Sequence, residues 1–361
     1  MQRKTLMFYI NAIHDGGAER VIIQLAHHFA NIGYRAVLVT SFIDINEYPV
    51  PDNVERISIE QEQIQQSKLK RNISRILALR KFCKKYNPEA LISFMAEPNF
   101  RAIIATAGLP VKRIVSVRND PNREYRGKIG NIVGKYIIPR ADGCVFQTRE
   151  AQQWFSKKFQ KKSEVIFNDV DKVFFETKYR GSNDIVTLGR LSSQKNQKML
   201  IKAFSMIADS YPEHNLLIYG VGPLEQELRE LISKLHLEER VILKGLTTDA
   251  PSVFAATGIF VLSSDYEGMP NALMEALAIG VPCIATDCPC GGPRVLIDNG
   301  VNGLLVPVGD KEKMAETLSA LLDNVELAKK LSVNAREQAR AYRTELVFNK
   351  WKEYVEKVIN L

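Results

Sequence analysis

Short apolar runs alternate with longer amphipathic stretches along the 361-residue chain, and few folds accommodate this alternation. In the first half, runs of four to six residues predict buried strands at 5–10, 35–40, 90–94, 113–117 and 143–146. After the first of them, apolar residues recur at helical spacing from Ala18 to Asn31, and Gly33 ends the predicted helix. Strands that alternate with helices in this way predict an α/β protein with a doubly wound sheet.

A second series of strands follows a polar stretch between Asn168 and Asn183. These strands are predicted at 185–188, 216–219, 241–243 and 259–262. The sequence therefore predicts two similar Rossmann-like domains, an N-terminal one over 1–170 and a C-terminal one over 180–340. A last helix over 345–361 is expected to pack back on the first domain through one apolar side, formed by Val347, Trp351, Tyr354, Val355 and Val358.

The composition, with 45% hydrophobic and 25% charged residues, is that of a globular protein. No apolar run approaches the roughly 18 to 20 residues that span a bilayer, and the first run, 6–10, is too short for a secretory signal. The five cysteines and five histidines lack metal-type spacings, so we expect neither disulfides nor a metal site. Cys288 and Cys290 are interpreted as part of a structural loop, and a reducing cytoplasm is the expected location.

The net charge of +8 is unevenly distributed between the two halves. Residues 1–165 contain 27 Lys and Arg against 15 Asp and Glu, whereas residues 166–361 contain 22 against 26. This asymmetry predicts that the first half meets an anionic partner, either a membrane face or a phosphate-bearing molecule. Nucleic acid is not expected, because the interleaving of aromatic and basic residues that grips bases is missing.

Much of this positive charge lies in a basic amphipathic stretch over 67–85. One interpretation is an ordinary solvated helix, and the other is a contact with a membrane surface or a lipid diphosphate. Its basic side chains are Lys68, Lys70, Arg71, Arg75, Arg80, Lys81, Lys84 and Lys85.

Two acids, Glu267 and Glu275, flank a Gly-x-Pro corner between a predicted strand and a predicted helix. Pro270 suits the first helical position, which leaves Glu267 on the loop and places Glu275 on the helix. A helix start exposes unpaired N–H groups and positive dipole, both of which attract phosphate. One acid is therefore predicted to meet a sugar and the other the ribose of a nucleotide; the alternative is a capped surface helix with two solvated acids.

A second polar loop, Gly189 to Asn196, follows the predicted strand at 185–188. It carries two cations five residues apart, Arg190 and Lys195, at the carboxyl end of a strand, where open α/β sheets bind ligands. This pair is predicted to clamp a diphosphate and to neutralise the charge that develops on a nucleotide leaving group. A solvated turn is the alternative.

Two glycine-rich turns complete the candidate sites. Gly16 and Gly17 precede a helix and would let its backbone approach a phosphate or an acceptor group closely, although a sharp turn alone also explains them. His14, just before them, is either an active-site polar group or a turn residue. The glycines at 220 and 222 suggest a dinucleotide fingerprint, but Glu225 occupies the third glycine position, so we interpret this segment as a nucleotide-side turn.

Together with the segment from Asn302 to Pro307, these motifs resemble glycosyltransferase family 4 over nearly the whole chain. The resemblance implies the GT-B fold, in which two Rossmann-like domains face each other across a cleft. It also implies a nucleotide-sugar donor and transfer with retention of anomeric configuration, with no cofactor and no required metal.

The resemblance implies that Glu267, Arg190 and Lys195 are catalytic. Arg190 and Lys195 would bind the donor diphosphate, Glu275 the ribose, and Glu267 the donor sugar, while Gly17 would face the reaction centre. The full donor-binding set that it implies is Gly17, Gly189, Arg190, Lys195, Gly222, Glu267, Gly268, Met269, Pro270, Asn271 and Glu275.

The segment from Gly16 to Arg20 is similar to members that elongate polyprenyl-diphosphate-linked saccharides for bacterial surface glycans. This similarity implies transfer of a hexose or N-acetylhexosamine from a UDP-sugar, by an enzyme at the inner face of the cell membrane. The acceptor-side residues that it implies are His14, Gly16, Arg118 and Asn119. Alternatives are a sugar-nucleotide epimerase or phosphorylase on a related fold, and a non-catalytic sugar-nucleotide-binding regulator.

The chain departs from the family pattern at two places. Many members carry a histidine after the strand at 113–117, where this chain has Arg118, and Asp169 replaces the usual glycine after Asn168. Arg118 is therefore predicted to be an active-site cation, for an acceptor phosphate or for the donor. The alternative is a structural salt-bridge partner.

Overall fold

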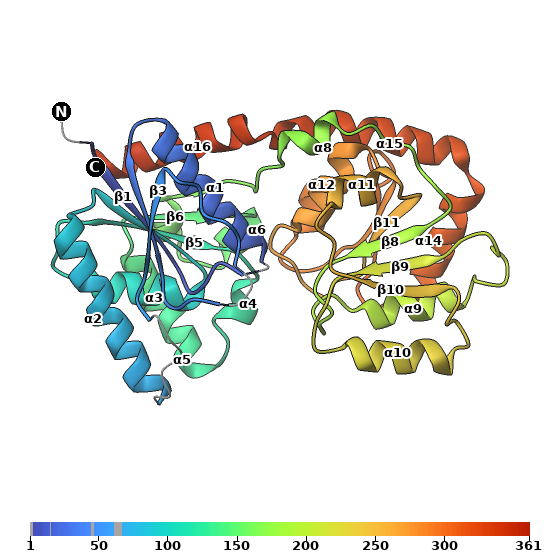
Figure 1. Cartoon of the computed structure of the whole chain (residues 1–361), viewed down its shortest axis with the longest axis horizontal. Helices are drawn as coiled ribbons and strands as arrows, with labels where there is room; N and C mark the ends of the chain where they lie inside the picture. The colour runs from blue at the N-terminus through green and yellow to red at the C-terminus, as the bar shows by residue number, and fades with distance from the viewer. Residues whose placement is uncertain (1–2, 15, 45–46, 61–66) are drawn as a thin grey trace. The chain divides into compact units, whose positions relative to one another are not determined.

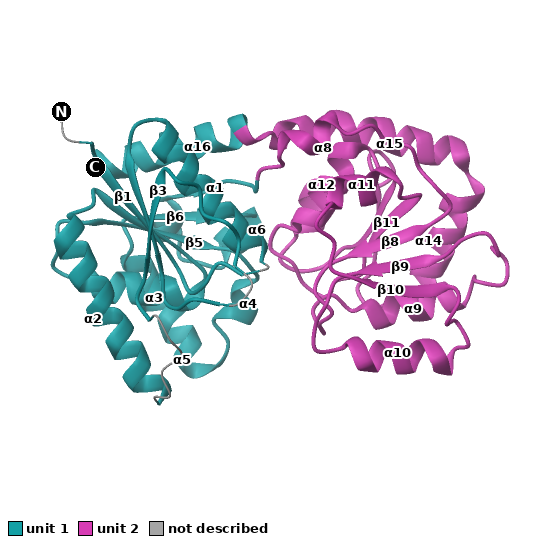
Figure 2. Cartoon of the chain, in the orientation of Figure 1, with its two compact units in different colours: residues 1–168, 345–361 teal, residues 169–344 magenta. Residues whose placement is uncertain are grey.

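The computed structural model describes residues 3–14, 16–44, 47–60 and 67–361, and the chain divides into two compact units (Figure 1, Figure 2). Unit 1 comprises residues 1–168 and 345–361, and unit 2 comprises residues 169–344. Each unit contains one parallel sheet with helices on both faces. The predicted α/β fold class is therefore confirmed. Within the described residues, no helix combines the length and apolar character needed to cross a bilayer.

The sheet of unit 1 has seven parallel strands in the order β3-β2-β1-β4-β5-β6-β7. Its strands are β1 (Thr5–Ile10), β2 (Arg35–Thr40), β3 (Val54–Ser58), β4 (Ala90–Phe94), β5 (Lys112–Val117), β6 (Gly143–Phe146) and β7 (Ser163–Val165). The helical segments are α1 (Gly17–Asn31), α2 (Lys68–Tyr86), α3 (Ala96–Ala105), α4 (Pro121–Glu124), α5 (Gly127–Ile132), η1 (Val133–Ile137), η2 (Ile138–Arg140), α6 (Arg149–Gln153) and α7 (Lys157–Gln160), with α16 (Thr344–Ile359).

Both faces of this sheet are buried, which explains the continuous apolar runs of its central strands. Along β1, alternate side chains point to opposite faces. Leu6 and Phe8 join a cluster with α1 and α16, whereas Met7 and Tyr9 join a cluster with α2 and α3.

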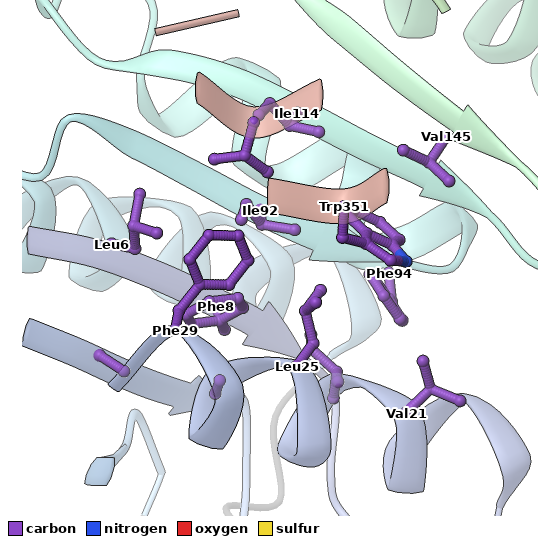
Figure 3. Packing of buried hydrophobic residues seen from close by; sticks show 14 of the residues in the cluster. Leu6, Phe8, Val21, Leu25, Phe29, Ile92, Phe94, Ile114, Val145 and Trp351 are labelled. Carbon is purple, nitrogen blue, oxygen red and sulfur yellow. The ribbon is translucent and has the colours of Figure 1, made fainter. Parts of the chain in front are cut away.

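Helix α16, at the end of the chain, packs through an apolar side against the N-terminal part of unit 1. Trp351 is fully buried and stacks on Phe94, with ring centroids 5.8 Å apart (Figure 3). The hydroxyl of Tyr354 accepts a 2.7 Å hydrogen bond from the backbone N–H of Cys144 and lies 2.7 Å from the carbonyl oxygen of Lys162. Residues separated by about two hundred positions thus complete one core.

Unit 2 has six parallel strands in the order β10-β9-β8-β11-β12-β13. They are β8 (Ile185–Leu188), β9 (Leu216–Tyr219), β10 (Val241–Gly245), β11 (Ile259–Leu262), β12 (Cys283–Thr286) and β13 (Leu304–Val306). Its helices are α8 (Lys172–Glu176), α9 (Gln197–Ser205), α10 (Glu225–Lys234), α11 (Ala250–Ala255), α12 (Asn271–Ile279), α13 (Gly292–Leu296), α14 (Lys311–Asp323), α15 (Val325–Ala339) and η3 (Arg340–Tyr342).

In each sheet the strand order reverses at one point, between β1 and β4 in unit 1 and between β8 and β11 in unit 2. Ligands of open α/β sheets bind in the crevice outside the carboxyl ends of strands at such a switch point. The loops that follow β8 and β11 carry Arg190, Lys195 and Glu267, while Glu275 lies on α12. The glycine pair lies after β1, at the start of α1.

Candidate active site

Two loops meet at the switch point of unit 2. One connects β8 to α9 over residues 189–196, and the other connects β11 to α12 over residues 263–270; we call them the cation loop and the acid loop. The amide of Asn196 donates a 2.7 Å hydrogen bond to the carboxylate of Asp265, and the hydroxyl of Ser263 donates one of 2.8 Å to the carbonyl of Lys195. These bonds hold the two loops in a fixed register.

The central contact between these loops is an ion pair that joins Lys195 to Glu267. The Nζ atom of Lys195 lies 2.5 Å from Oε1 of Glu267, and the side chains are 22% and 7% exposed, respectively. The hydroxyl of Ser264 donates a 2.6 Å hydrogen bond to the same oxygen. Two residues predicted to contact different parts of a donor therefore contact each other, so a diphosphate that binds Lys195 competes with the carboxylate.

The backbone of Glu267 is held as firmly as its side chain. Its N–H donates a 2.7 Å hydrogen bond to the carbonyl of Pro289, and its carbonyl accepts a 3.0 Å bond from the N–H of Cys290. The neighbouring Cys288 is buried, and burial raises the pKa of its thiol to about 12. Cys288 and Cys290 are both buried thiols outside any disulfide, and no cluster of metal ligands occurs among the described residues.

Arg190 occupies the start of the cation loop with an exposed side chain. Its guanidinium has no hydrogen bond or ion pair with any other residue in the described part of the chain, while its carbonyl accepts a 3.0 Å bond from the amide of Gln197. The backbone is therefore anchored and the charge is available to a ligand.

The glycines after β9 support the cation loop. Gly220 has a φ of 134°, and a Cβ atom there would lie 2.0 Å from the carbonyl oxygen of Gly189. At Gly222 the same atom would lie 2.3 Å from the carbonyl oxygen of Leu191. A side chain at either position would clash with the backbone on either side of Arg190, so close packing requires glycine at both.

The acid loop leads into α12, whose first turn has no side-chain cap at Pro270. Its N–H groups are the kind that bind phosphate or sugar oxygens. Gly268, Met269 and Pro270 are buried just before this helix, and Glu275 is buried in its second turn, 4% exposed. All the donor-side residues predicted in unit 2 therefore lie on the two loops, on the start of α12, or on the turn after β9.

In unit 1, the loop after β1 places His14, Gly16 and Gly17 before and at the start of α1. Asp15 of this loop lies outside the described residues. The carboxylate of Glu19 folds back so closely that a Cβ on Gly16 would lie 1.8 Å from it. Burial raises the pKa of Glu19, and backbone N–H groups together with the nearby side chains of His14 and Arg118 act in the opposite direction.

Arg118 follows β5 and is buried, 8% exposed. Its guanidinium lies 4.5 Å from the ring centroid of Phe94 and donates a hydrogen bond to the side-chain oxygen of Asn168. The predicted neighbour Asn119 uses its side-chain oxygen locally, as the acceptor of a 2.9 Å bond from the N–H of Asp120. The charge of Arg118 therefore acts on the carboxyl of Glu19 in α1. The side chain of Asn119, in contrast, bonds to the backbone of the next residue.

Sequence reasoning missed Ser264 and Gln194, which surround the Glu267 carboxylate, and it missed Glu19 and Glu124 in unit 1. Ser264 could have been found from the sequence, because Ser263 to Asp265 are polar and directly follow an apolar strand, where ligands of α/β sheets bind.

Glu124 ends α4 with an oxygen, Oε2, that is inaccessible to solvent and has no hydrogen-bond partner among the described residues. Burial raises the pKa of this carboxyl to about 8; the charge of Asp120 adds to the rise and that of Arg118 opposes it. At neutral pH the carboxyl is therefore mostly protonated.

This titration predicts a pH dependence of stability. Between the ordinary carboxyl pKa of about 4.3 and the native value of about 8, the native state holds one more proton than the unfolded state. Stability therefore falls as the pH rises, by at most about 1.4 kcal/mol per pH unit. We expect Glu124→Gln to flatten the decline of the thermal unfolding midpoint between pH 6 and 8.5. The exposed Glu164→Gln should leave it as in the wild type, and an equal slope in all three proteins would contradict the burial of this carboxyl.

Two family models match the chain, one described as Glycosyltransferase Family 4 over residues 15–173 and one as Glycosyl transferases group 1 over residues 169–338. An uncharacterized glycosyltransferase of Haemophilus influenzae is 28% identical over 356 residues, which cover 97% of this chain and 99% of that protein.

A Campylobacter jejuni protein named as an α-1,4-N-acetyl-D-galactosaminyltransferase for a saccharide on PP-undecaprenol is 25% identical, covering 98% of this chain and 99% of its own. The crystal structure of Anabaena HepE with UDP and glucose superposes with a TM-score of 0.82 at 18% identity, covering 98% of this chain and 99% of the other. The similarity to these proteins thus extends over both halves of the chain.

Proposed function

The chain belongs to glycosyltransferase family 4 and has the GT-B fold, and we propose that it moves a hexose or N-acetylhexosamine from a UDP-sugar to a saccharide on a polyprenyl diphosphate. As a member of this family it is an enzyme that uses a nucleotide-sugar donor. The observation that carries the finer proposal is the end-to-end similarity to a transferase named for a PP-undecaprenol-linked saccharide. The structure of HepE with UDP and glucose supports a UDP-linked donor.

In the proposed reaction, Arg190 and Lys195 hold the donor diphosphate beside the start of α12. The bond between the anomeric carbon and the diphosphate oxygen breaks while the cations neutralise the charge that develops on that oxygen. An acceptor hydroxyl attacks from the face that the diphosphate leaves, and its proton passes to the departing phosphate oxygen, so the configuration is retained. The two cations would do the work that a divalent metal does in other enzymes.

Glu267 has a separate part in this proposal. Its backbone is pinned by the segment around Pro289, and Ser264 orients its carboxylate. A carboxylate held in this way positions the donor sugar and stabilises positive charge at the anomeric carbon. When the diphosphate engages Lys195, Glu267 becomes free to accept hydrogen bonds from sugar hydroxyls.

A two-stage experiment tests the proposal. A thermal-shift panel of UDP-, GDP- and ADP-sugars identifies the donor, because a ligand that binds the native state raises its stability. The donor is then incubated with short-chain polyprenyl-diphosphate saccharides, and the product is analysed by mass spectrometry and by the anomeric coupling constant. Donor isomerised without acceptor indicates an epimerase, sugar phosphate formed from inorganic phosphate indicates a phosphorylase, and binding without turnover indicates a regulator. Each of these outcomes contradicts the proposed transfer.

Arg190→Ala should lower turnover about tenfold to more than a hundredfold, since a hydrogen bond to a charged group contributes about 1.5–3 kcal/mol. Its exposed side chain makes no hydrogen bond or ion pair with another described residue, so the thermal midpoint should stay close to that of the wild type. Arg229→Ala on α10, which removes a surface ion pair with Glu225, is the matched control and should keep full activity. An unchanged rate for Arg190→Ala would contradict the diphosphate assignment.

A further inference from the structure

The segment α5–η1 of unit 1 presents its large apolar side chains to solvent. Ile129, Ile132 and Tyr136 are 80%, 54% and 67% exposed. Its inward side carries small residues instead, and a Cβ on Gly134 would lie 2.8 Å from the ring of Trp154. A surface helix of a soluble domain ordinarily buries its apolar side, so this arrangement is inverted.

Helix α2 shows a similar exposed stripe. Leu69, Ile73 and Leu77 are spaced four residues apart, which places them on one side of the helix, and they are 72%, 50% and 61% exposed. The inward side is filled by other residues, including the fully buried Leu79 and Cys83. The outer stripe is therefore not part of the core.

Both elements pack against α3, so they lie on the same face of the sheet (Figure 1). Ile104 of α3, 38% exposed, lies on the helix that they share. We call the set formed by Leu69, Ile73, Leu77, Ile104, Ile129, Ile132 and Tyr136 the outer apolar surface.

The charges around the outer apolar surface are mostly positive. Helix α2 contains eight Lys and Arg and no acidic residue. Exposed cations also surround α5–η1, namely Arg123, Arg126, Lys128, Lys135 and Arg140. From 121 to 140 the one acid is Glu124, whose Oε2 atom is inaccessible to solvent, and near α2 Glu97 lies 3.9 Å from Lys68. Apolar side chains within a field of cations fit an anionic lipid surface, where both kinds contribute to binding.

We propose that the outer apolar surface docks unit 1 on an anionic lipid bilayer, with its isoleucines and leucines in the headgroup boundary and the flanking lysines and arginines on lipid phosphates. This inference rests on the proposed function for its role, because a lipid-linked acceptor is confined to such a surface. The binding itself requires no sugar transfer and is measured separately.

The test is sedimentation of the full chain with vesicles of phosphatidylcholine alone and of phosphatidylcholine with 30% phosphatidylglycerol. The wild type should bind the anionic vesicles and not the neutral ones. Ile129→Ser with Ile132→Ser should lower the partition coefficient at least tenfold. Lys70→Ala with Lys81→Ala should lower it about 25-fold, since each cation near an anionic leaflet contributes about fivefold.

The matched control is Val325→Ser with Val333→Ser, which removes two apolar side chains of α15 that are 60% and 70% exposed in unit 2. This variant should bind anionic vesicles as the wild type does. Equal binding by all variants, an equal loss in the control, or no binding by the wild type would overturn the proposal. So would a self-association in sedimentation velocity that the Ile129 and Ile132 substitutions abolish, because a second copy would then cover the surface.

The two proposals fail in different ways. Every vesicle-binding variant should transfer sugar to a short-chain, water-soluble acceptor at the wild-type rate, because the changed side chains are exposed and none of them is among the residues proposed to bind the donor or the acceptor. If the wild type transfers sugar to no acceptor while its vesicle binding depends on the outer apolar surface, the proposed function is wrong and the docking surface stands. If transfer occurs and vesicle binding is absent, the docking surface is wrong.

Discussion

Lys195→Ala is expected to lower kcat/KM for the donor about 100- to 1000-fold, a larger loss than we expect for Arg190→Ala. The substitution removes a charge-assisted contact with the donor diphosphate, which contributes about 1.5–3 kcal/mol. It also removes the cation that lies 2.5 Å from Glu267, which leaves a carboxylate of 7% exposure with Ser264 as its nearest donor. A misplaced Glu267 then adds to the loss, because the donor sugar is no longer positioned.

Two measurements separate these contributions. Affinity for the nucleoside diphosphate without its sugar, from the thermal shift, reports the diphosphate contact alone, and single-turnover rates with the full donor report the positioning by Glu267. Stability without donor should fall by about 1–3 kcal/mol, the cost of an unsatisfied buried polar group. Lys198→Ala, three residues further on α9, removes a more exposed ion pair with Glu227 and should change neither quantity. Wild-type kinetics in Lys195→Ala would show that the pair is structural and would remove the basis of the proposed mechanism.

The central architecture could be predicted from the sequence because buried parallel strands are continuous apolar runs. All five strands predicted in the first half are present in the structure. The predicted helix from Ala18 to Asn31 is also present and begins one residue earlier, at Gly17. Gly280 follows α12 with a φ of 93°, the left-handed conformation in which a glycine commonly ends a helix. These elements can be predicted from neighbouring residues alone, because a strand buried on two faces is a continuous apolar run and a helix often ends at a glycine.

The strands that the sequence did not reveal, β3, β7 and β13, all lie at the edge of a sheet. An edge strand pairs on one side only and is partly open to solvent, so it needs no long apolar run. Although β13 reads Leu-Leu-Val, it has only three residues. In β3, four of the five residues are partly exposed, and β7 has only three residues. Their position depends on pairing with distant strands, which a local pattern does not contain.

The candidate site shows the same limit. The sequence placed Arg190, Lys195 and Glu267 at the carboxyl ends of strands, but it did not indicate that β8 and β11 are neighbours. That pairing brings the cation loop and the acid loop together and makes Lys195 and Glu267 contact each other. The roles of these residues in transfer stay a prediction, which the Lys195 and Arg190 variants test.

Trp351→Ala should lower the free energy of unfolding of unit 1 by about 3–5 kcal/mol, the range for truncating a large buried aromatic side chain. Trp351 is fully buried on α16, stacks on Phe94, and lies among residues from β1, β4 and α1 (Figure 3). Its ring fills the space between a helix from the end of the chain and a sheet from its beginning. Its loss therefore weakens the attachment of α16 as well as leaving a cavity.

Hydrogen exchange provides the measurement, because two units need not unfold in a single transition. In Trp351→Ala, amides of α16 and of the central strands of unit 1 should exchange faster, while those of β8 and β11 in unit 2 should keep their wild-type rates. Glu353→Ala changes an exposed position of the same helix and is the control, with an expected effect within about 0.5 kcal/mol. A loss below about 1 kcal/mol in Trp351→Ala would mean that α16 contributes little to the core of unit 1. Equal acceleration in both units would mean that they unfold as one.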